Sequence, residues 1–257
     1  MPELLSVGSD SKTVKGQVHG YLTGILYLAP SDISGTEICY DKTEACEFLC
    51  LNESGHGAIS KASVKFEAPS GRLVPDNSVQ KARLRKTALY LNDEPTFFYK
   101  LTSDMDKMIL KADKLGLLPC FRLNGTSDLV IESLVDPNTE IKILKLYPEI
   151  QFYDYTKSAT RYKRFLSDKL PDNYHLIYSV SEKQASLDFG LKGLSIGGTC
   201  AIVFDKVPKE FMGYPVVDGD NSDLRFLDKS GVIVGLKAKG KARKDQTGFV
   251  RRLAVSC

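Results

Sequence analysis

The sequence contains no tryptophan and no long apolar run, and its net charge is close to zero. No window approaches the roughly 18–20 uninterrupted apolar residues of a membrane-spanning helix. Residues 1–16 lack the charged and apolar parts of a secretory signal. These absences predict a soluble, cytoplasmic protein with no membrane partner. The formal charge of +3 on 257 residues gives no whole-protein argument for nucleic-acid binding, so any such argument needs a local patch.

Histidine is scarce, and its placement excludes two classes of hydrolase. His19, His56 and His175 form neither an HExxH pair nor a recognisable part of a Ser–His–Asp triad. Apolar residues at 42% and charged residues at 26% are ordinary for globular proteins, so the chain has enough material for a core. The length suits one large α/β domain.

Strand-like and helix-like stretches alternate between residues 18 and 207. The expected strands are 21–29, 117–123, 150–155, 175–180 and 200–204. The expected helices are 78–91, 103–115 (capped by Thr102 or Ser103), 158–167 and 182–190. Such alternation favours parallel βα units, so we expect an α/β fold with a partial or full (βα) barrel. Residues 1–20 are expected to be a polar lead-in segment.

The pattern changes after residue 207. Short strand-like stretches at 214–218, 223–228 and 232–236 are separated by turns rich in Gly, Asp and Ser. We therefore expect residues 208–257 to form a short antiparallel, β-rich extension of the 18–207 core, within a single domain.

Three of the six cysteines lie close together, in a loop that follows the first predicted strand. Cys39, Cys46 and Cys50 have the spacing C-x6-C-x3-C within mostly polar residues, which fits a buried core poorly. In a reducing cytoplasm clustered thiols indicate metal ligands rather than disulfides, and soft thiolates select zinc, copper(I) or iron–sulfur centres.

Ligand number separates these metals. Structural zinc normally takes four ligands, and a fourth one here (His56, Cys120, Cys200 or Cys257) would have to arrive through the fold. Three thiolates with one open position favour a 4Fe-4S cluster, with zinc as the alternative.

Polar side chains also follow three successive predicted strands. Arginine suits a carboxylate or phosphate, and aspartate suits an amine or hydroxyl. Each group alone is a common turn or helix cap, but together they favour one shared site for a polar ligand at the carboxyl ends of the strands. These residues are Arg122, Asn124, Asp128, Asp154, Lys157, Ser179 and Glu182.

The strongest local charge lies near the C-terminus. Lys237, Lys239, Lys241 and Arg243 occupy alternate positions, which predicts one basic face of a strand, and two further arginines follow. This face suits the phosphates of a nucleic acid, the phosphate of a small substrate, or contact with water alone.

Several blocks of this sequence are distinctive in combination, and they span residues 18–252. They are the cysteine loop, 122–128, 151–157, 179–182, 218–220, 235–243 and 248–250. Together they resemble the phage family gene product 88. This resemblance implies a phage or mobile-element protein made in the host bacterial cytoplasm, and it implies no particular activity.

A three-cysteine loop after the first strand of a βα barrel is also similar, more distantly, to the radical S-adenosylmethionine enzymes. That likeness implies a 4Fe-4S cluster on Cys39, Cys46 and Cys50, with S-adenosylmethionine on the open iron. It places Arg122, Asn124 and Asp128 near that family's Gly-Gly-Glu motif, and Asp154, Lys157, Ser179 and Glu182 along the nucleoside site. The usual spacing in that family is C-x3-C-x2-C, and no Gly-Gly-Glu is present here.

The sequence therefore leads to one hypothesis and two alternatives. The hypothesis is a phage-encoded iron–sulfur enzyme of radical S-adenosylmethionine-like type that acts on a nucleotide or nucleic acid. One alternative is a zinc-stabilised nucleic-acid-binding protein without catalysis, which uses the 237–252 stretch. The other is a metal-free barrel enzyme acting on a phosphorylated small molecule.

Overall fold

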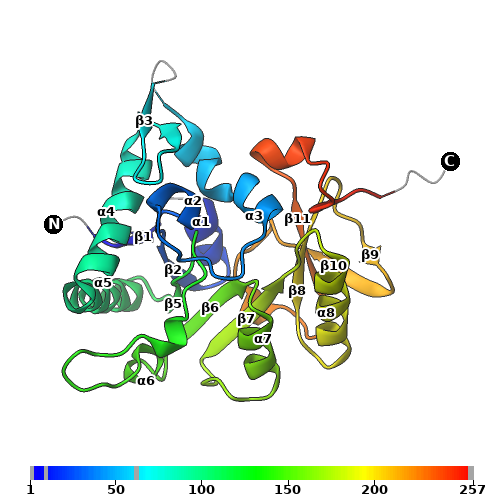
Figure 1. Cartoon of the computed structure of the whole chain (residues 1–257). Coiled ribbons are helices and arrows are strands. Elements are labelled where there is room, and N and C mark those ends of the chain that lie inside the picture. The colour runs from blue at the N-terminus through cyan, green and yellow to red at the C-terminus, as the bar shows by residue number, and fades with distance from the viewer. Residues whose placement is uncertain (1–2, 9–10, 61–63, 254–257) are drawn as a thin grey trace. The chain divides into compact units, whose positions relative to one another are not determined.

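The computed structural model describes residues 3–8, 11–60 and 64–253. The chain divides into two compact units, each with strands and helices (Figure 1). The first unit comprises Met1–Tyr40, Asn52–Asp154 and Pro171–Tyr174, and the second comprises Asp41–Leu51, Tyr155–Leu170 and His175–Cys257. The chain passes between them at 40/41, 51/52, 154/155, 170/171 and 174/175. That both units belong to one domain stays a prediction.

The first unit holds the longest helices and a set of mainly parallel strands. Its elements are β1 (Leu5–Val7), α1 (Ser11–Val18), β2 (Tyr21–Leu26), α2 (Ser31–Ser34), η2 (Gly55–Ala58), β3 (Lys65–Glu67), β4 (Leu73–Pro75), α4 (Ser78–Asn92), α5 (Glu94–Lys114), β5 (Leu118–Arg122), η4 (Ile131–Ser133), α6 (Ile143–Leu146) and β6 (Gln151–Thr156). β2 pairs in parallel with β5, and β5 with β6, whereas β1 pairs antiparallel with β2. β3 and β4 form a separate hairpin.

Helices α4 and α5 follow one another directly, and α5 packs along β5, β2 and β1 (Figure 1). α4 confirms the helix predicted over 78–91. The predicted start of α5 at Thr102 or Ser103 is wrong, because the helix begins nine residues earlier, at Glu94. The Asp93 side chain accepts a hydrogen bond from Thr96 N at 3.0 Å and Pro95 occupies the first turn, which together make a good helix start.

The sequence did not predict β1, and charged side chains from the two long helices explain why it forms. Leu4 N donates to Asp104 Oδ2 at 2.6 Å, and Lys86 Nζ donates to Leu4 O at 2.5 Å. Burial, followed by the nearby Arg83, lowers the pKa of Lys86 to about 8. The N-terminal strand is thus held by long-range polar contacts that leave no mark in its own residue pattern.

The second unit contains the remaining strands and shorter helices. Its elements are α3 (Glu44–Phe48), α7 (Ala159–Leu166), β7 (Tyr174–Ser179), α8 (Gln184–Ser195), β8 (Cys200–Phe204), β9 (Glu210–Phe211), β10 (Tyr214–Asp218), η5 (Arg225–Leu227), β11 (Ile233–Lys237), η6 (Gly240–Lys244) and β12 (Val250–Arg251). β8 pairs in parallel with β7, β11 and β12, and β11 pairs in parallel with β10.

These pairings correct the expected antiparallel extension after residue 207. Among the described strands after residue 207, only the short β9 pairs antiparallel, with β10, and β10, β11 and β12 are all parallel additions to the sheet. The strand expected at 223–228 is instead the 3-10 helix η5, in which Arg225 is 2% exposed. Parallel neighbours need a return connection, and residues 219–232 provide it here without a long helix.

The expected α/β class with a large, mostly parallel sheet is confirmed. Within residues 3–8, 11–60 and 64–253 the strand order of the sheet runs from β1 to β9 without a closing pair, so a barrel is not shown. No helix in this part of the chain has the length and apolar character needed to cross a membrane.

Aromatic side chains fill much of the core of the second unit, and a histidine lies among them. The His175 ring packs edge-on against Phe165 at a centroid distance of 5.2 Å, and Thr199 Oγ1 lies 3.4 Å from His175 Nε2. Burial, followed by the charge of Arg225, lowers the pKa of His175 to about 4. His175 therefore stays neutral in the folded protein well below its ordinary titration range.

We expect His175 to make the protein less stable as the pH falls from 6.5 to about 4. Between these two pH values His175 is protonated in the unfolded chain but stays neutral in the folded chain, because its pKa is lower when folded. The shift corresponds to a loss of up to about 3 kcal/mol in the free energy of unfolding. Urea unfolding of wild type and His175→Gln across this range should show a smaller pH dependence in the variant.

The matched control is His19→Gln, which replaces an exposed histidine of the first unit. An equal pH dependence in wild type and His175→Gln would contradict the assignment to His175.

Candidate nucleic-acid interface

The cysteine loop, residues 39–50, divides between the two units. Cys39 lies in the first unit, and its backbone N donates to Glu37 Oε1 at 3.0 Å. Cys46 and Cys50 lie in the second unit, on and just after α3. Thr43 begins this helix, since its Oγ1 accepts a hydrogen bond from Cys46 N at 3.2 Å. All three thiol-bearing residues are half-buried.

The predicted metal site is not shown. Among the residues with described positions, no three His, Cys, Asp or Glu side chains gather closely enough to hold a metal ion. Cys120 is buried in the first unit beside Thr23, and burial raises the pKa of the Cys200 thiol to about 12. Cys257 lies outside the described residues. The cysteine ligands predicted from spacing therefore stay a prediction.

Asn124 and Asp154 of the first unit are joined in a buried network. Asn124 N donates to Asp154 Oδ1 at 2.7 Å, and Tyr174 OH donates to Asp154 Oδ2 at 3.0 Å. Asn124 Oδ1 also accepts from Leu129 N at 2.8 Å and from Ser127 Oγ at 2.9 Å. The Asn124 and Asp154 residues are 2% and 1% exposed, so these contacts fix the loop after β5 from within.

Arg122 and Asp128 flank this network in the first unit. Arg122 ends β5 and is 6% exposed, whereas Asp128 is half-buried and its backbone N donates to Ile38 O at 3.0 Å. The ligand-binding roles expected for these two residues stay predictions.

In the second unit, the ends of β6 and β7 bring Lys157 and Ser179 together. Lys157 Nζ lies 3.1 Å from Ser179 Oγ and 5.0 Å from the ring centroid of Phe249. Glu182 follows β7, and its Oε2 accepts a hydrogen bond from Thr43 Oγ1 at 2.8 Å. Thus the cap of α3 is tied to the end of β7, and Lys157 is a half-buried cation at the same strand ends.

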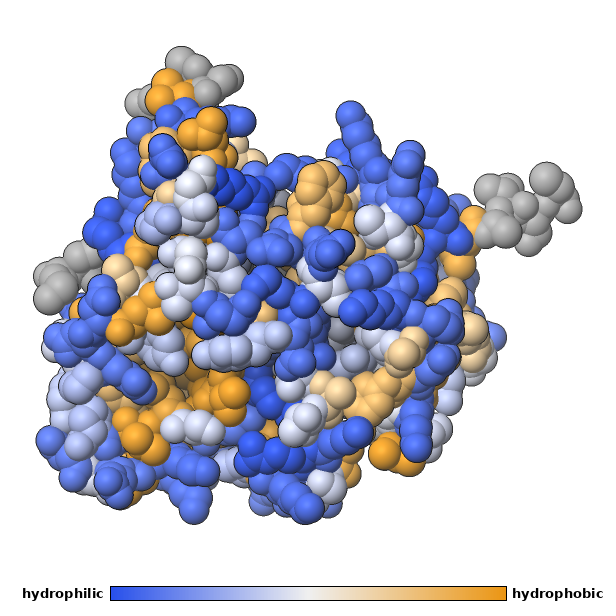
Figure 2. All heavy atoms as spheres, viewed as in Figure 1, coloured by the Kyte–Doolittle hydropathy of each residue, from blue (hydrophilic) through white to orange (hydrophobic). Residues whose placement is uncertain are grey.

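Residues 237–252, the basic segment, hold seven basic residues and one acidic residue, a net charge of +6. Because the whole chain carries +3, the rest of the chain sums to −3. The predicted strand face is wrong, since β11 ends at Lys237 and residues 240–244 form the 3-10 helix η6. All four predicted residues are nevertheless exposed, and hydrophilic side chains cover this segment in Figure 2. Those four are Lys237, Lys239, Lys241 and Arg243.

A small apolar cluster explains why the basic side chains point outward. Ala238 and Ala242 are buried against Val250 and against Leu49, the residue that ends α3. With the alanines turned inward, the intervening Lys239 and Lys241 face the solvent. Leu49 packing therefore attaches α3 to the basic segment.

Asp245 and Arg251 fix the remainder of the basic segment. Burial opposes ionisation of Asp245, but backbone hydrogen bonds from Val250 and Thr247, each at 2.9 Å, outweigh it, and the pKa of Asp245 is lowered. Arg251 donates to Ser181 O at 3.0 Å, and burial lowers its pKa while Glu182 and Asp245 oppose that shift. An ionised Asp245 thus holds the turn that leads into β12.

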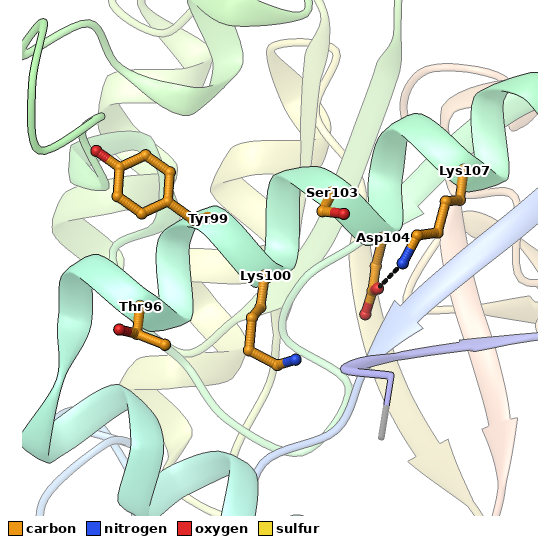
Figure 3. A pocket seen from close by; sticks show the side chains of 6 residues that line it. All are labelled: Thr96, Tyr99, Lys100, Ser103, Asp104 and Lys107. Atoms are coloured by element: carbon orange, nitrogen blue, oxygen red, sulfur yellow. Dashed lines mark hydrogen bonds and ion pairs between the residues drawn. The ribbon is translucent and has the colours of Figure 1, made fainter. Parts of the chain in front are cut away.

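A hollow of about 360 Å³ lies on the first unit along one face of α5 (Figure 3). Its six lining residues are Thr96, Tyr99, Lys100, Ser103, Asp104 and Lys107. Asp104 lies in its floor, where it accepts from Leu4 N and meets Lys107 Nζ at 3.5 Å. This carboxylate is already used to hold β1, and its charge opposes an anionic ligand, so this hollow is the weaker candidate.

Sequence reasoning missed the aromatic contribution to the basic surface. Phe48 is 65% exposed and its ring centroid lies 5.8 Å from Lys241 Nζ. Phe249 lies in the 248–250 block and was given no role from the sequence, although its ring centroid is 5.0 Å from Lys157 Nζ. The available signal was the placement of aromatic residues next to the basic run and the cysteine loop.

Comparison with known proteins gives one match. No curated protein and no solved structure matches the chain, so the likeness to radical S-adenosylmethionine enzymes gains no support. The family model described as Gene product 88 matches residues 3–253, nearly the whole chain. This confirms the resemblance carried by the motifs, and the chain belongs to the Gene product 88 family.

Proposed function

We propose that this protein is a phage-encoded nucleic-acid-binding protein that uses the basic segment of its second unit. The observation that carries the proposal is the concentration of charge. Residues 237–252 carry +6 while the rest of the chain sums to −3. Contacts to phosphates dominate nucleic-acid affinity, and a local basic stripe is their usual electrostatic footprint.

The fold supports the proposal because it presents these charges on an ordered surface. Burial of Ala238 and Ala242 leaves the flanking cations outside, and the Asp245 turn fixes the chain beyond them. Of the exposed cations, Lys239 has an acidic partner, Asp220, at 2.6 Å. Lys241 Nζ lies 5.8 Å from the ring centroid of Phe48. Lys157 and Ser179, at the strand ends of the same unit, add a second group suited to phosphate.

A metal centre at the cysteine loop is a second proposal. Its support is the C-x6-C-x3-C spacing and the placement of Cys46 on α3 and of Cys50 just after the end of this short helix. Among the described residues no three His, Cys, Asp or Glu side chains gather, so those placed do not fit a 4Fe-4S cluster. When bound, such a cluster would supply one-electron chemistry.

The finer sequence hypotheses belong to this second proposal. They are a barrel fold, zinc as the alternative metal, and the binding of S-adenosylmethionine at the strand ends. The residues expected to bind it are Arg122, Asn124, Asp128, Asp154, Lys157, Ser179 and Glu182. A metal-free enzyme acting on a phosphorylated small molecule would use the strand-end residues alone.

Neutralising Lys241 and Lys244 together should weaken binding to a fluorescently labelled oligonucleotide roughly tenfold at about 0.1 M salt. The slope of log affinity against log salt should fall by about 1.4, because each phosphate contact to a single strand contributes about 0.7. The variant is Lys241→Gln with Lys244→Gln, measured by fluorescence anisotropy over a range of salt concentrations.

The matched control is Lys111→Gln with Lys114→Gln on α5, which removes the same charge at the same spacing from exposed positions of the first unit. Equal losses in the two double variants would mean that net charge alone attracts the nucleic acid. No binding by the wild-type protein would overturn the proposed function.

The metal proposal predicts about four iron atoms per chain and visible absorption after anaerobic purification, both lost in Cys46→Ser. Cys120→Ala, in the core of the first unit, is the control that should keep them. One zinc per chain would favour the zinc alternative. A wild-type protein without either metal would remove the second proposal.

A further inference from the structure

Phe48 is unusual among the aromatic side chains of the second unit because it is 65% exposed. Its neighbour Leu49 is 6% exposed and packs against Ala238, Ala242 and Val250. Burial of Leu49 therefore determines how α3 is seated on the basic segment. The Phe48 ring is left at the surface, beside the cations of η6.

The contact between Phe48 and Lys241 combines an aromatic face with a cation. Lys241 Nζ lies 5.8 Å from the Phe48 ring centroid. Arg243 and Lys244 are exposed on the same short helix η6. On the other flank, Glu44 and Glu47 belong to α3 and would repel phosphate, so a bound backbone would run on the η6 side.

An exposed ring next to cations suits a single strand better than a duplex. Unpaired bases present their faces for stacking on an aromatic side chain, while neighbouring lysine and arginine hold the phosphates. In a duplex the base faces are stacked on one another, and only the phosphates and groove edges are accessible. Phe48 would contribute little to duplex binding.

Building on the proposed function, we infer that the second unit binds single-stranded nucleic acid, with Phe48 as the residue on which a base stacks. Lys241 and its neighbours in η6 contact the adjacent phosphates.

The chain has no tryptophan, so Phe48→Trp introduces the only indole and makes it a direct reporter. We expect an oligothymidine strand to quench the emission of this tryptophan severalfold, and a duplex hairpin of equal charge to leave it nearly unchanged. Tyr99→Trp, an exposed aromatic position of the first unit beside Lys100, is the matched reporter and should not respond.

Affinity gives a second readout that does not depend on fluorescence. Phe48→Ala should weaken binding of the single strand about tenfold, within the range of stacking contributions, and Tyr99→Ala should not change it. Because Phe48 is exposed, its variants should keep the unfolding midpoint of the wild type, which circular dichroism checks.

The outcomes separate this inference from the proposed function. Binding that depends on Lys241 and Lys244 but not on Phe48, or equal affinity for duplex and single strand, would overturn the inference and leave the proposed function standing. Loss of single-strand preference in Phe48→Ala, together with quenching in Phe48→Trp, supports both. A wild-type protein that binds neither form overturns both.

Discussion

The packing of Leu49 against Ala238, Ala242 and Val250 is the contact on which the surface of the second unit depends. It joins a short helix near the N-terminus to a segment near the C-terminus, although most of the chain lies between them. Its partners are mainly small residues, because only a small side chain lets the backbone of the basic segment approach α3 closely. Both α3 and η6 have five residues, and isolated helices of that length are not stable in water, so both depend on tertiary contacts such as this one.

Much of the fold was predictable from the sequence where local patterns and final structure agree. The buried strand β8 and the more exposed strand β10 lie where their apolar runs predict, and α4 begins at the predicted serine. The predictions fail where contacts between residues far apart in the sequence determine the structure. β1 is held by Lys86 and Asp104, and the pairing direction of β10 and β11 depends on a connection with no helical pattern. Their direction was inferred from the short turn-like segments between them, which are typical of antiparallel hairpins.

The candidate site was predicted less well than the fold. The basic residues are exposed, but they do not form the predicted strand face. Alternating charges fit a strand, and they fit equally a non-strand segment in which Ala238 and Ala242 are buried. Asn124 and Asp154 were expected to face a ligand; they are joined by a buried hydrogen bond, and a ligand role for them stays a prediction. Short polar residues at strand ends satisfy backbone groups as readily as they bind ligands, and sequence does not separate these roles. The aromatic ring of Phe48 was missed because its neighbour in space is almost two hundred residues away in the sequence.

The order of the basic segment has a consequence for the thermodynamics of association. A run rich in lysine, glycine and alanine has the composition of an arm that stays disordered until it meets nucleic acid. Here the inward alanines and the Asp245 turn have already ordered it in the isolated chain. The conformational entropy of this backbone is therefore lost when the chain folds, and not when it binds nucleic acid. Binding at this surface should accordingly have a small heat-capacity change, in proportion to the area covered and without the larger change of coupled folding.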